Sequence, residues 1–369
     1  MEHRYINKGL LILLLAASVA GLSEKTVAQG ESAVPFLLIA PNSRAAGIGE
    51  SGTGSVDDAS AIFWNPAALA YLDGQEVSIT HANWLPQFQQ ADLFYDYLNY
   101  RRRIDDLGGV VGASVTYLNL GEFIRTNSSG TEEGRFRAFE FAVTAGYATK
   151  AFEELAVGLN LRFIHSHLSP LGTAVEGGDG IASTISFDIA AMYKPALFNN
   201  DLSVGVNLSN LGPKITYVDA DQADPIPTNL RLGFGYRVFE DEFNKLTFSL
   251  DFSRLLIRRY AVAPGDSVEP KPPDPAYKAI FTAWGDGSGL RKVNISTGLE
   301  YWYDKLIALR IGYFYEDPSF GNRKFLTFGA GIRYDIYGFD FSYISASENH
   351  PLSDTIRFSL LISWGGVNI

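Results

Sequence analysis

The sequence contains no cysteine in 369 residues. The chain can therefore form neither disulfides nor cysteine-ligated zinc and iron–sulfur sites, and it cannot use a thiol nucleophile. Charged side chains are scarce, at 19% against about 25% in an ordinary soluble domain, but hydrophobic residues reach 46%, which does not fit a disordered chain. Because the net charge of −11 repels phosphate, we expect no nucleic-acid partner.

A long apolar run is also missing, since no uncharged stretch reaches the roughly 20 residues that a transmembrane helix needs. The apolar run 10–20 follows Arg4 and Lys8 and precedes the small-residue pattern at 26–28. This arrangement is typical of a secretory signal. We expect residues 1–28 to be a signal peptide, with cleavage after Ala28 or, alternatively, after Ala20.

Glycine and aromatic residues are abundant, and from about residue 76 the hydrophobic residues alternate with a period of two. The clearest case is the last segment, where Arg357, Ser359 and Ser363 oppose a row of large apolar side chains. That row consists of Ile356, Phe358, Leu360, Ile362 and Trp364. Such alternation predicts β-strands with one apolar and one polar face.

The positions of the charges indicate which environment the apolar face meets. Charged residues in the middle of these segments all fall on the parity opposite to the large apolar residues: Glu140, Arg162, Asp188, Arg231, Asp251, Arg310, Arg333, Asp340 and Arg357. A charge that faces lipid costs about 2–4 kcal/mol at the midplane. The pattern therefore favours a membrane β-barrel over a soluble sandwich, with small and polar residues in the lumen.

About fourteen alternating segments follow one another, and an even number suits a closed bacterial barrel. We place them at 76–83, 92–101, 108–118, 136–149, 153–168, 181–194, 201–210, 228–238, 246–256, 291–302, 305–315, 323–335, 337–346 and 354–364. Long and short connections alternate, as in outer-membrane barrels with long extracellular loops and short periplasmic turns. We expect an outer-membrane barrel over residues 76–369 with both of its ends in the periplasm.

Residues 29–75 break the alternation and are expected to form a segment that plugs the lumen. Residues 47–52 match the G-x-G-x-x-G pattern, but the strand–turn–helix unit that dinucleotide binding requires is not indicated downstream. The stretch 57–72 predicts a short helix interrupted at Pro66, because the residue before a proline avoids the helical region.

Several stretches of the chain resemble a known family. Asp58-Ala59-Ser60 ahead of Asn65-Pro66-Ala67 resembles the plug motif of FadL-type outer-membrane proteins. More specifically, the chain resembles the PorV/PorQ family of type IX secretion, whose members are FadL-like barrels. The matching stretches are 35–49 (PFLLIAPNSRAAGIG), 64–67 (WNPA), 227–233 (PTNLRLG), 244–256 (NKLTFSLDFSRLL), 300–303 (EYWY), 310–316 (RIGYFYE), 338–343 (GFDFSY) and 355–361 (TIRFSLL).

The resemblance implies an all-β, fourteen-stranded barrel with an N-terminal plug, in Bacteroidetes-type bacteria. It implies a protein that binds the C-terminal signal domain of exported cargo and carries it from the translocon to the cell-surface attachment complex. Its expected partners are therefore cargo signal domains, translocon and attachment-complex proteins, and outer-membrane lipid. The residues assigned to the plug motif are Arg44, Gly47, Gly49, Trp64, Asn65, Pro66 and Ala67.

The long loops are the expected place for partner binding, above all 211–227 and the proline-rich 257–290. The residues assigned to this role are Tyr217, Asp219, Pro225, Tyr260, Tyr277, Trp284 and Phe320. We expect no catalysis, cofactor or metal site: His165 and His167 share one strand face, but the sequence does not indicate a third ligand.

Two alternative functions remain. One is a FadL-type transporter of hydrophobic small molecules, in which residues around Asn65 and Pro66 gate a path through the lumen. The other is an outer-membrane enzyme that acts on lipopolysaccharide, although the sequence shows no serine nucleophile in a recognisable turn.

Overall fold

The computed structural model describes residues 32–88, 92–127, 129–169, 179–198, 201–260, 271–347 and 350–365. The signal peptide expected at 1–28 lies outside these residues. Within the described ranges, helices are all too short or too polar to cross a bilayer.

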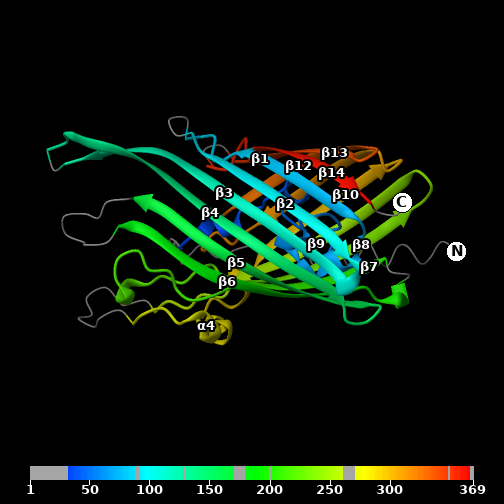
Figure 1. The fold of residues 1–369 in the computed structure, drawn as a ribbon, viewed down its shortest axis with the longest axis horizontal. Coiled ribbons are helices and arrows are strands. Elements are labelled where there is room, and N and C mark those ends of the chain that lie inside the picture. Colours follow the sequence, from blue (N-terminus) through cyan, green and yellow to red (C-terminus); the bar gives the residue numbers. More distant parts are fainter. Residues whose placement is uncertain are drawn as a thin grey trace.

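Fourteen antiparallel strands form one closed barrel, in which each strand pairs with its neighbours in sequence and the first strand pairs with the last (Figure 1). The strands are β1 (Gln75–Asn83), β2 (Phe94–Ile104), β3 (Gly109–Thr126), β4 (Glu132–Lys150), β5 (Leu155–Ser169), β6 (Gly180–Tyr193), β7 (Leu202–Leu211), β8 (Asn229–Glu240), β9 (Asn244–Leu255), β10 (Asn294–Tyr303), β11 (Ile307–Tyr315), β12 (Lys324–Tyr334), β13 (Tyr337–Ala346) and β14 (Ile356–Trp364). The predicted fold class and strand number are confirmed.

Short helices occupy the N-terminal segment and several connections. They are η1 (Pro35–Leu38), α2 (Ser43–Gly47), α3 (Ala61–Trp64), η2 (Pro66–Tyr71), η3 (Asp105–Leu107), η4 (Ala196–Phe198), η5 (Ala220–Gln222), α4 (Ala276–Thr282), η6 (Ala283–Gly285) and η7 (Gly289–Lys292). The helix predicted within 57–72 is therefore present as α3 and η2, and the break falls at Asn65, directly before Pro66.

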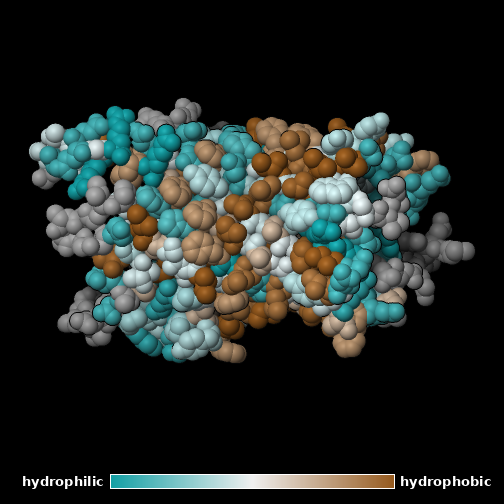
Figure 2. Space-filling view, viewed as in Figure 1, coloured by the Kyte–Doolittle hydropathy of each residue, from teal (hydrophilic) through white to brown (hydrophobic). Residues whose placement is uncertain are grey.

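The two faces of the strands differ as the alternation predicts. On β14, Arg357 is fully buried, whereas Leu360 is 57% exposed on the opposite face. The other charged residues in mid-strand positions are buried inside the barrel as well, apart from Arg333, whose side chain is 25% exposed. Hydrophobic side chains gather over the middle of the barrel exterior and hydrophilic ones toward its two ends (Figure 2). The apolar exterior is the surface that lipid covers.

The connections differ at the two ends of the barrel. One end carries the long loops, including 212–228 and 256–293, and we call it the long-loop end. The other carries short turns such as 304–306 and 335–336, and we call it the short-turn end. The long-loop end lies at the left of Figure 1, where α4 sits below the barrel.

The third and fourth strands are longer than predicted. A loop was expected over 119–135, but β3 continues to Thr126 and β4 begins at Glu132. The hairpin projects beyond the barrel, so its outer part has water on both faces (Figure 1). Charges such as Glu122 and Arg135 occur there, and the alternation of apolar and polar residues is therefore absent from the sequence. The two strands stay paired through ion pairs and through stacking of Phe123 on Phe136.

The N-terminal segment, defined here as residues 33–74, lies inside the barrel. α2 contacts strands β11–β14 on one side of the lumen, and η2 contacts β3–β6 on the other. Its apolar residues, among them Phe36, Ile62 and Leu69, form the main buried cluster together with inward-facing residues of the wall. The core of this protein therefore lies between the N-terminal segment and the barrel wall.

We expect the cost of a charge on the exterior to depend on its depth. Leu360→Arg, in the middle of β14, should reduce the free energy of unfolding in lipid vesicles by about 2–4 kcal/mol. Tyr334→Arg is the control. Tyr334 also lies on the outward face, but it is the last residue of β12 at the short turn, close to the membrane interface, where the expected cost is about 0–1 kcal/mol. Equal losses for both variants would contradict a lipid-facing exterior.

Candidate functional site

Asn65 and Pro66 fix the turn between α3 and η2. Asn65 has the extended backbone that a residue before proline prefers (φ −161°). Its side-chain oxygen accepts a hydrogen bond from the Ala67 amide at 3.1 Å and so caps η2. Its side-chain nitrogen donates to the carbonyl oxygens of Thr53 (2.9 Å) and Ala191 (3.1 Å). One side chain thus ties the turn to the rest of the segment and to strand β6.

Trp64 is buried beside this turn. Its Nε1 donates to Oδ1 of Asn42 at 3.0 Å, so the indole is satisfied within the N-terminal segment. Gly52 lies against the ring, where a Cβ would come within 2.8 Å of it. The barrel wall also binds this region, because the side-chain nitrogen of Asn207 on β7 donates a hydrogen bond to the carbonyl oxygen of Trp64 at 3.0 Å.

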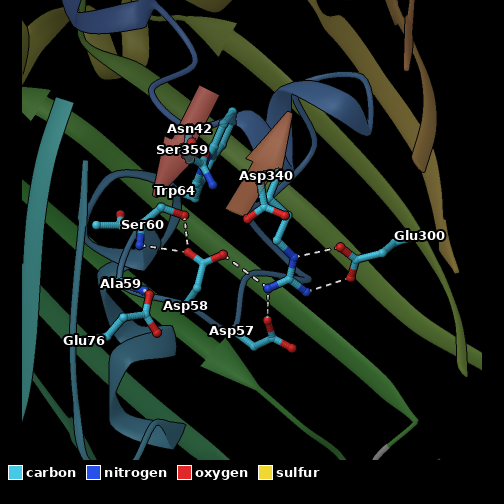
Figure 3. Close-up of polar contacts among 12 residues, drawn as sticks. Asn42, Asp57, Asp58, Ala59, Ser60, Trp64, Glu76, Glu300, Asp340 and Ser359 are labelled. Carbon is cyan, nitrogen blue, oxygen red and sulfur yellow. Dashed lines mark hydrogen bonds and ion pairs between the residues drawn. The ribbon is translucent and has the colours of Figure 1, made fainter. Parts of the chain in front are cut away.

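Arg44 of α2 is the centre of an ionic cluster between the segment and the wall. Its Nε and Nη2 donate to both carboxylate oxygens of Glu300 on β10, at 2.8 and 2.7 Å. Nη1 contacts Asp57 and lies 3.2 Å from Oδ2 of Asp58. Asp57, Asp58 and Glu300 converge from different sides in Figure 3. The bidentate pair fixes the position of α2, because a guanidinium matches a carboxylate in both charge and geometry.

The cluster continues along the wall through alternating charges. Arg310 on β11 is fully buried and donates to Glu300 at 2.7 Å and to Asp340 on β13 at 2.8 Å. Arg333 on β12 donates to the other oxygen of Asp340 at 2.6 Å. Each of these buried carboxylates therefore faces two arginines, which offsets much of the cost of removing the charges from water.

A second anchor holds the segment by its backbone. Oδ2 of Asp251 on β9 accepts hydrogen bonds from the amides of Gly52 and Thr53, at 2.9 and 2.7 Å. Gly49 must be glycine: its φ is +75°, and a Cβ there would lie 2.5 Å from the carbonyl oxygen of Thr297. Gly47 approaches the wall in the same way, since a Cβ would lie 3.1 Å from the Cα of Gly329.

A cavity of about 160 Å³ opens beside the Arg44 cluster at the short-turn end. Arg44, Asp57 and Glu300 border it from the segment and β10, and Lys194 and Lys245 border it from the barrel wall. Charged side chains of both signs therefore border the cavity, beside apolar residues such as Ile48 and Met192.

Glu300, Arg310, Asp251 and Asp340 were missed as site residues. The alternation places all four on the lumen-facing parity, but parity does not tell which lumen residues meet the N-terminal segment. The sequence signal that could have pointed to them is the number of charges on the lumen-facing parity, because burying a charge without a partner of opposite sign is costly.

Comparison with known proteins settles the family. The family model described as "Type IX secretion system protein PorV" matches residues 23–261, more than half of the chain. The chain belongs to the PorV family. The resemblance found in the sequence is thereby confirmed, and the chain is an outer-membrane β-barrel of the type IX secretion system. A comparison with curated protein sequences finds no match.

Solved structures with the same fold include two toluene transporters and a further channel. The Ralstonia pickettii toluene transporter TbuX aligns with a TM-score of 0.52 and 14% identity, over 88% of this chain and 98% of that one. The Pseudomonas putida toluene transporter TodX gives 0.53 and 12%, over 88% and 99%. The CymD monoaromatic hydrocarbon channel gives 0.51 and 14%, over 88% and 97%. At such identities the likeness shows a shared FadL-like fold.

The residues assigned to partner binding in this PorV-family chain lie in different surroundings. Tyr217 turns toward the wall, where its hydroxyl donates to Ser166 at 2.8 Å, and Pro225 is buried. Asp219 is exposed. Phe320 is half-buried, and its ring centre lies 5.5 Å from the guanidinium carbon of Arg291 and 5.4 Å from Nζ of Lys292. Their role in binding stays a prediction.

The loop between β9 and β10 carries the other three assigned residues, Tyr260, Tyr277 and Trp284. Arg254 of β9 organises it by donating to the carbonyl oxygen of Ala283 at 2.9 Å and by lying 4.4 Å from the centre of the Trp284 ring. Tyr277 on α4 is 75% exposed. The described part of this loop is therefore folded and presents aromatic side chains outward.

Asp274 holds the same loop together. Its carboxylate accepts hydrogen bonds from Lys278 (2.9 Å), Thr282 (2.8 Å) and the Tyr260 hydroxyl (2.9 Å). Burial by itself would raise the pKa of Asp274, but these three donors and the charge of Lys278 outweigh it and lower the pKa to about 2.

His165 and His167 lie on the outward face of β5, with aromatic neighbours. The ring centroid of Phe139 is 4.9 Å from that of His167 and 6.1 Å from that of His165. Among the residues that the structure describes, no group of three or more acidic or histidine side chains is arranged to hold a metal ion.

Removing Arg44 should release the segment from the wall. Arg44→Gln leaves Glu300 and Asp58 buried with fewer partners, and we expect a loss of about 3–5 kcal/mol in the free energy of unfolding in lipid vesicles. Arg103→Gln is the control, because among the residues that the structure describes the Arg103 side chain forms only surface ion pairs, with Asp73 and Asp105, each worth about 0–1 kcal/mol. A similar small loss for both variants would show that the cluster does not hold α2.

The β9–β10 loop should lose order in acid. A lowered pKa in the folded state means that the carboxylate of Asp274 stabilises the loop above its ordinary pKa of 3.8, and that this contribution is lost as the pH falls toward 2. Protection of residues 274–282 against hydrogen exchange, measured relative to the intrinsic exchange rate at each pH, should therefore fall over that interval. Asp274→Asn should lower this protection about tenfold at neutral pH and remove its pH dependence. Unchanged exchange at neutral pH in this variant would contradict the assignment.

Proposed function

We propose that this protein binds the C-terminal signal domain of proteins exported by type IX secretion and carries them from the translocon to the cell-surface attachment complex. On this proposal the long-loop end faces the cell exterior, both ends of the barrel segment lie in the periplasm, and the N-terminal segment acts as a plug. The protein would act by reversible binding, without catalysis.

The observation that carries the proposal is membership of the PorV family together with a folded loop that presents aromatic side chains. Tyr277 and Phe281 lie one helical turn apart on α4 and are 75% and 78% exposed, and Leu290 nearby is 79% exposed. Exposed clusters of large apolar residues mark binding surfaces for proteins or membranes. The loop is held from within by Arg254 and Asp274, so such a surface needs little ordering on binding.

The experiment compares cargo recovery by tagged variants isolated from native outer membrane. Tyr277→Ser with Phe281→Ser should recover at least about tenfold less cargo than the unaltered protein, because these side chains are the proposed anchors. Phe152→Ser is the matched control, since Phe152 is 72% exposed at the short-turn end, where no cargo should bind. Recovery of no cargo by the unaltered protein, with normal secretion in a deletion strain, would overturn the proposal.

The alternative is a transporter of hydrophobic small molecules, as the names of the structural neighbours suggest for those proteins. The lumen of this chain argues against it, because charged side chains, among them Arg44, Lys194 and Glu300, border the cavity at the short-turn end. Loss of uptake of a hydrophobic solute in the deletion strain, with secretion intact, would favour the transporter.

A further inference from the structure

A second cavity, of about 80 Å³, lies at the long-loop end between the N-terminal segment and strands β8–β11. Glu50 and Trp64 border it from the segment, and Arg231 of β8 borders it from the wall. Neutral polar side chains such as Ser253 and Asn294 complete much of the lining. Asp251 also borders this cavity, and its carboxylate holds the amides of Gly52 and Thr53.

Arg231 differs from Arg162 and Arg310, two other buried arginines of the lumen. Arg162 pairs with Asp188 at 2.7 Å, and Arg310 pairs with Glu300 at 2.7 Å. Arg231 is only 7% exposed, yet within the described part of the chain its guanidinium has neither a hydrogen bond nor an ion pair. Instead the guanidinium lies against aromatic rings of the N-terminal segment, 4.9 Å from the centre of Phe63 and 5.1 Å from the centre of Trp64.

The acidic groups around Arg231 do not satisfy its donors. Asp251 attracts it, but the hydrogen bonds of that carboxylate go from Oδ2 to the amides of Gly52 and Thr53. Glu316 is already paired with Arg323, whose Nε and Nη2 donate to the two carboxylate oxygens of Glu316 at 2.8 Å each. A cation buried in this way is costly unless an anion or water supplies the missing acceptors. Arg231 itself is one of the residues that line the cavity, so an anion in that space can reach its donors.

We propose that this cavity binds a carboxylate group that enters from the long-loop end and pairs with Arg231. A guanidinium binds a carboxylate through two parallel hydrogen bonds, and one unpaired guanidinium balances one negative charge. Two further cations border the cavity, but Lys292 pairs with Asp286 and Arg323 pairs with Glu316. A dianion such as phosphate fits less well, because Glu50 and Asp251 border the same space and would repel it. Trp64 and Phe314 provide apolar surface for the group that carries the carboxylate.

The carboxylate has two possible sources, a small solute or the end of a polypeptide, and the test separates them. An N-acetylated dipeptide with a free carboxyl end is titrated into the purified full-length protein by calorimetry, beside the same dipeptide with an amidated end. Acetate and acetamide are then used as competitors. Binding of the free dipeptide with little competition by acetate assigns the site to polypeptide ends, and strong competition by acetate assigns it to small solutes. Equal binding of the free and amidated dipeptides overturns the proposal.

Three variants test the role of Arg231. Arg231→Gln should weaken binding of the free dipeptide at least tenfold, because it removes the charge and the paired donors. Arg237→Gln removes the same charge from the same strand at the short-turn end, where Arg237 pairs with Asp201, and should change affinity less than threefold. Glu50→Gln should strengthen binding severalfold, because it removes a negative charge from the cavity wall.

The Glu50 variant keeps the proposal falsifiable if Arg231→Gln fails to fold. An affinity that Glu50→Gln leaves unchanged or lowers would contradict a carboxylate site, as would unchanged binding by folded Arg231→Gln. These measurements need only the purified barrel and small probes. Their outcome is therefore independent of whether the protein carries cargo in the cell.

Discussion

Burying a charge without a partner is costly, and the ion pairs that offset this cost determine how the N-terminal segment sits in the lumen. The chain of ion pairs from Arg44 through Glu300, Arg310 and Asp340 to Arg333 joins α2 to four neighbouring strands. If any member were neutral, the adjacent buried charge would lose one of its partners, so the members of the chain depend on one another. The turn at Asn65 and the contacts of Asp251 place the rest of the segment around this fixed point.

Much of the fold could be predicted because one physical rule acts on every strand. Lipid excludes charge from one face of each strand. The positions of Arg231, Arg310 and Arg357 in the alternation therefore show which face lines the lumen, even when the pairing of the strands is unknown. The rule fails where lipid is absent: the outer part of the β3–β4 hairpin has water on both faces, and the sequence there resembles a loop.

The site could be predicted only in part, for a related reason. Parity showed that Glu300 and Asp340 face inward, but the partner of an inward charge depends on register and on the path of the N-terminal segment. The pairing of Arg44 with Glu300 spans 256 residues, and no local pattern encodes it. The loop contacts of Asp274 are local, yet they could not be assigned because hydrogen-bond donors are common in any polar loop.

A common barrel is compatible with very different interiors, because strand alternation constrains the outside far more than the inside. Here the lumen contains a cavity toward each end, and charged side chains border both. One fold can therefore serve secretion or transport according to which side chains fill the space that lipid does not reach.

The position of the N-terminal segment also bears on how the closed barrel is held together. The segment leads directly into β1, and β1 closes the barrel by pairing with β14, the last strand. α2 touches the strands on one side of this seam, and η2 touches those on the other. The backbones approach closely, as at Gly47 and Gly329. The contacts that fill the lumen therefore also link the two sides of the seam from within.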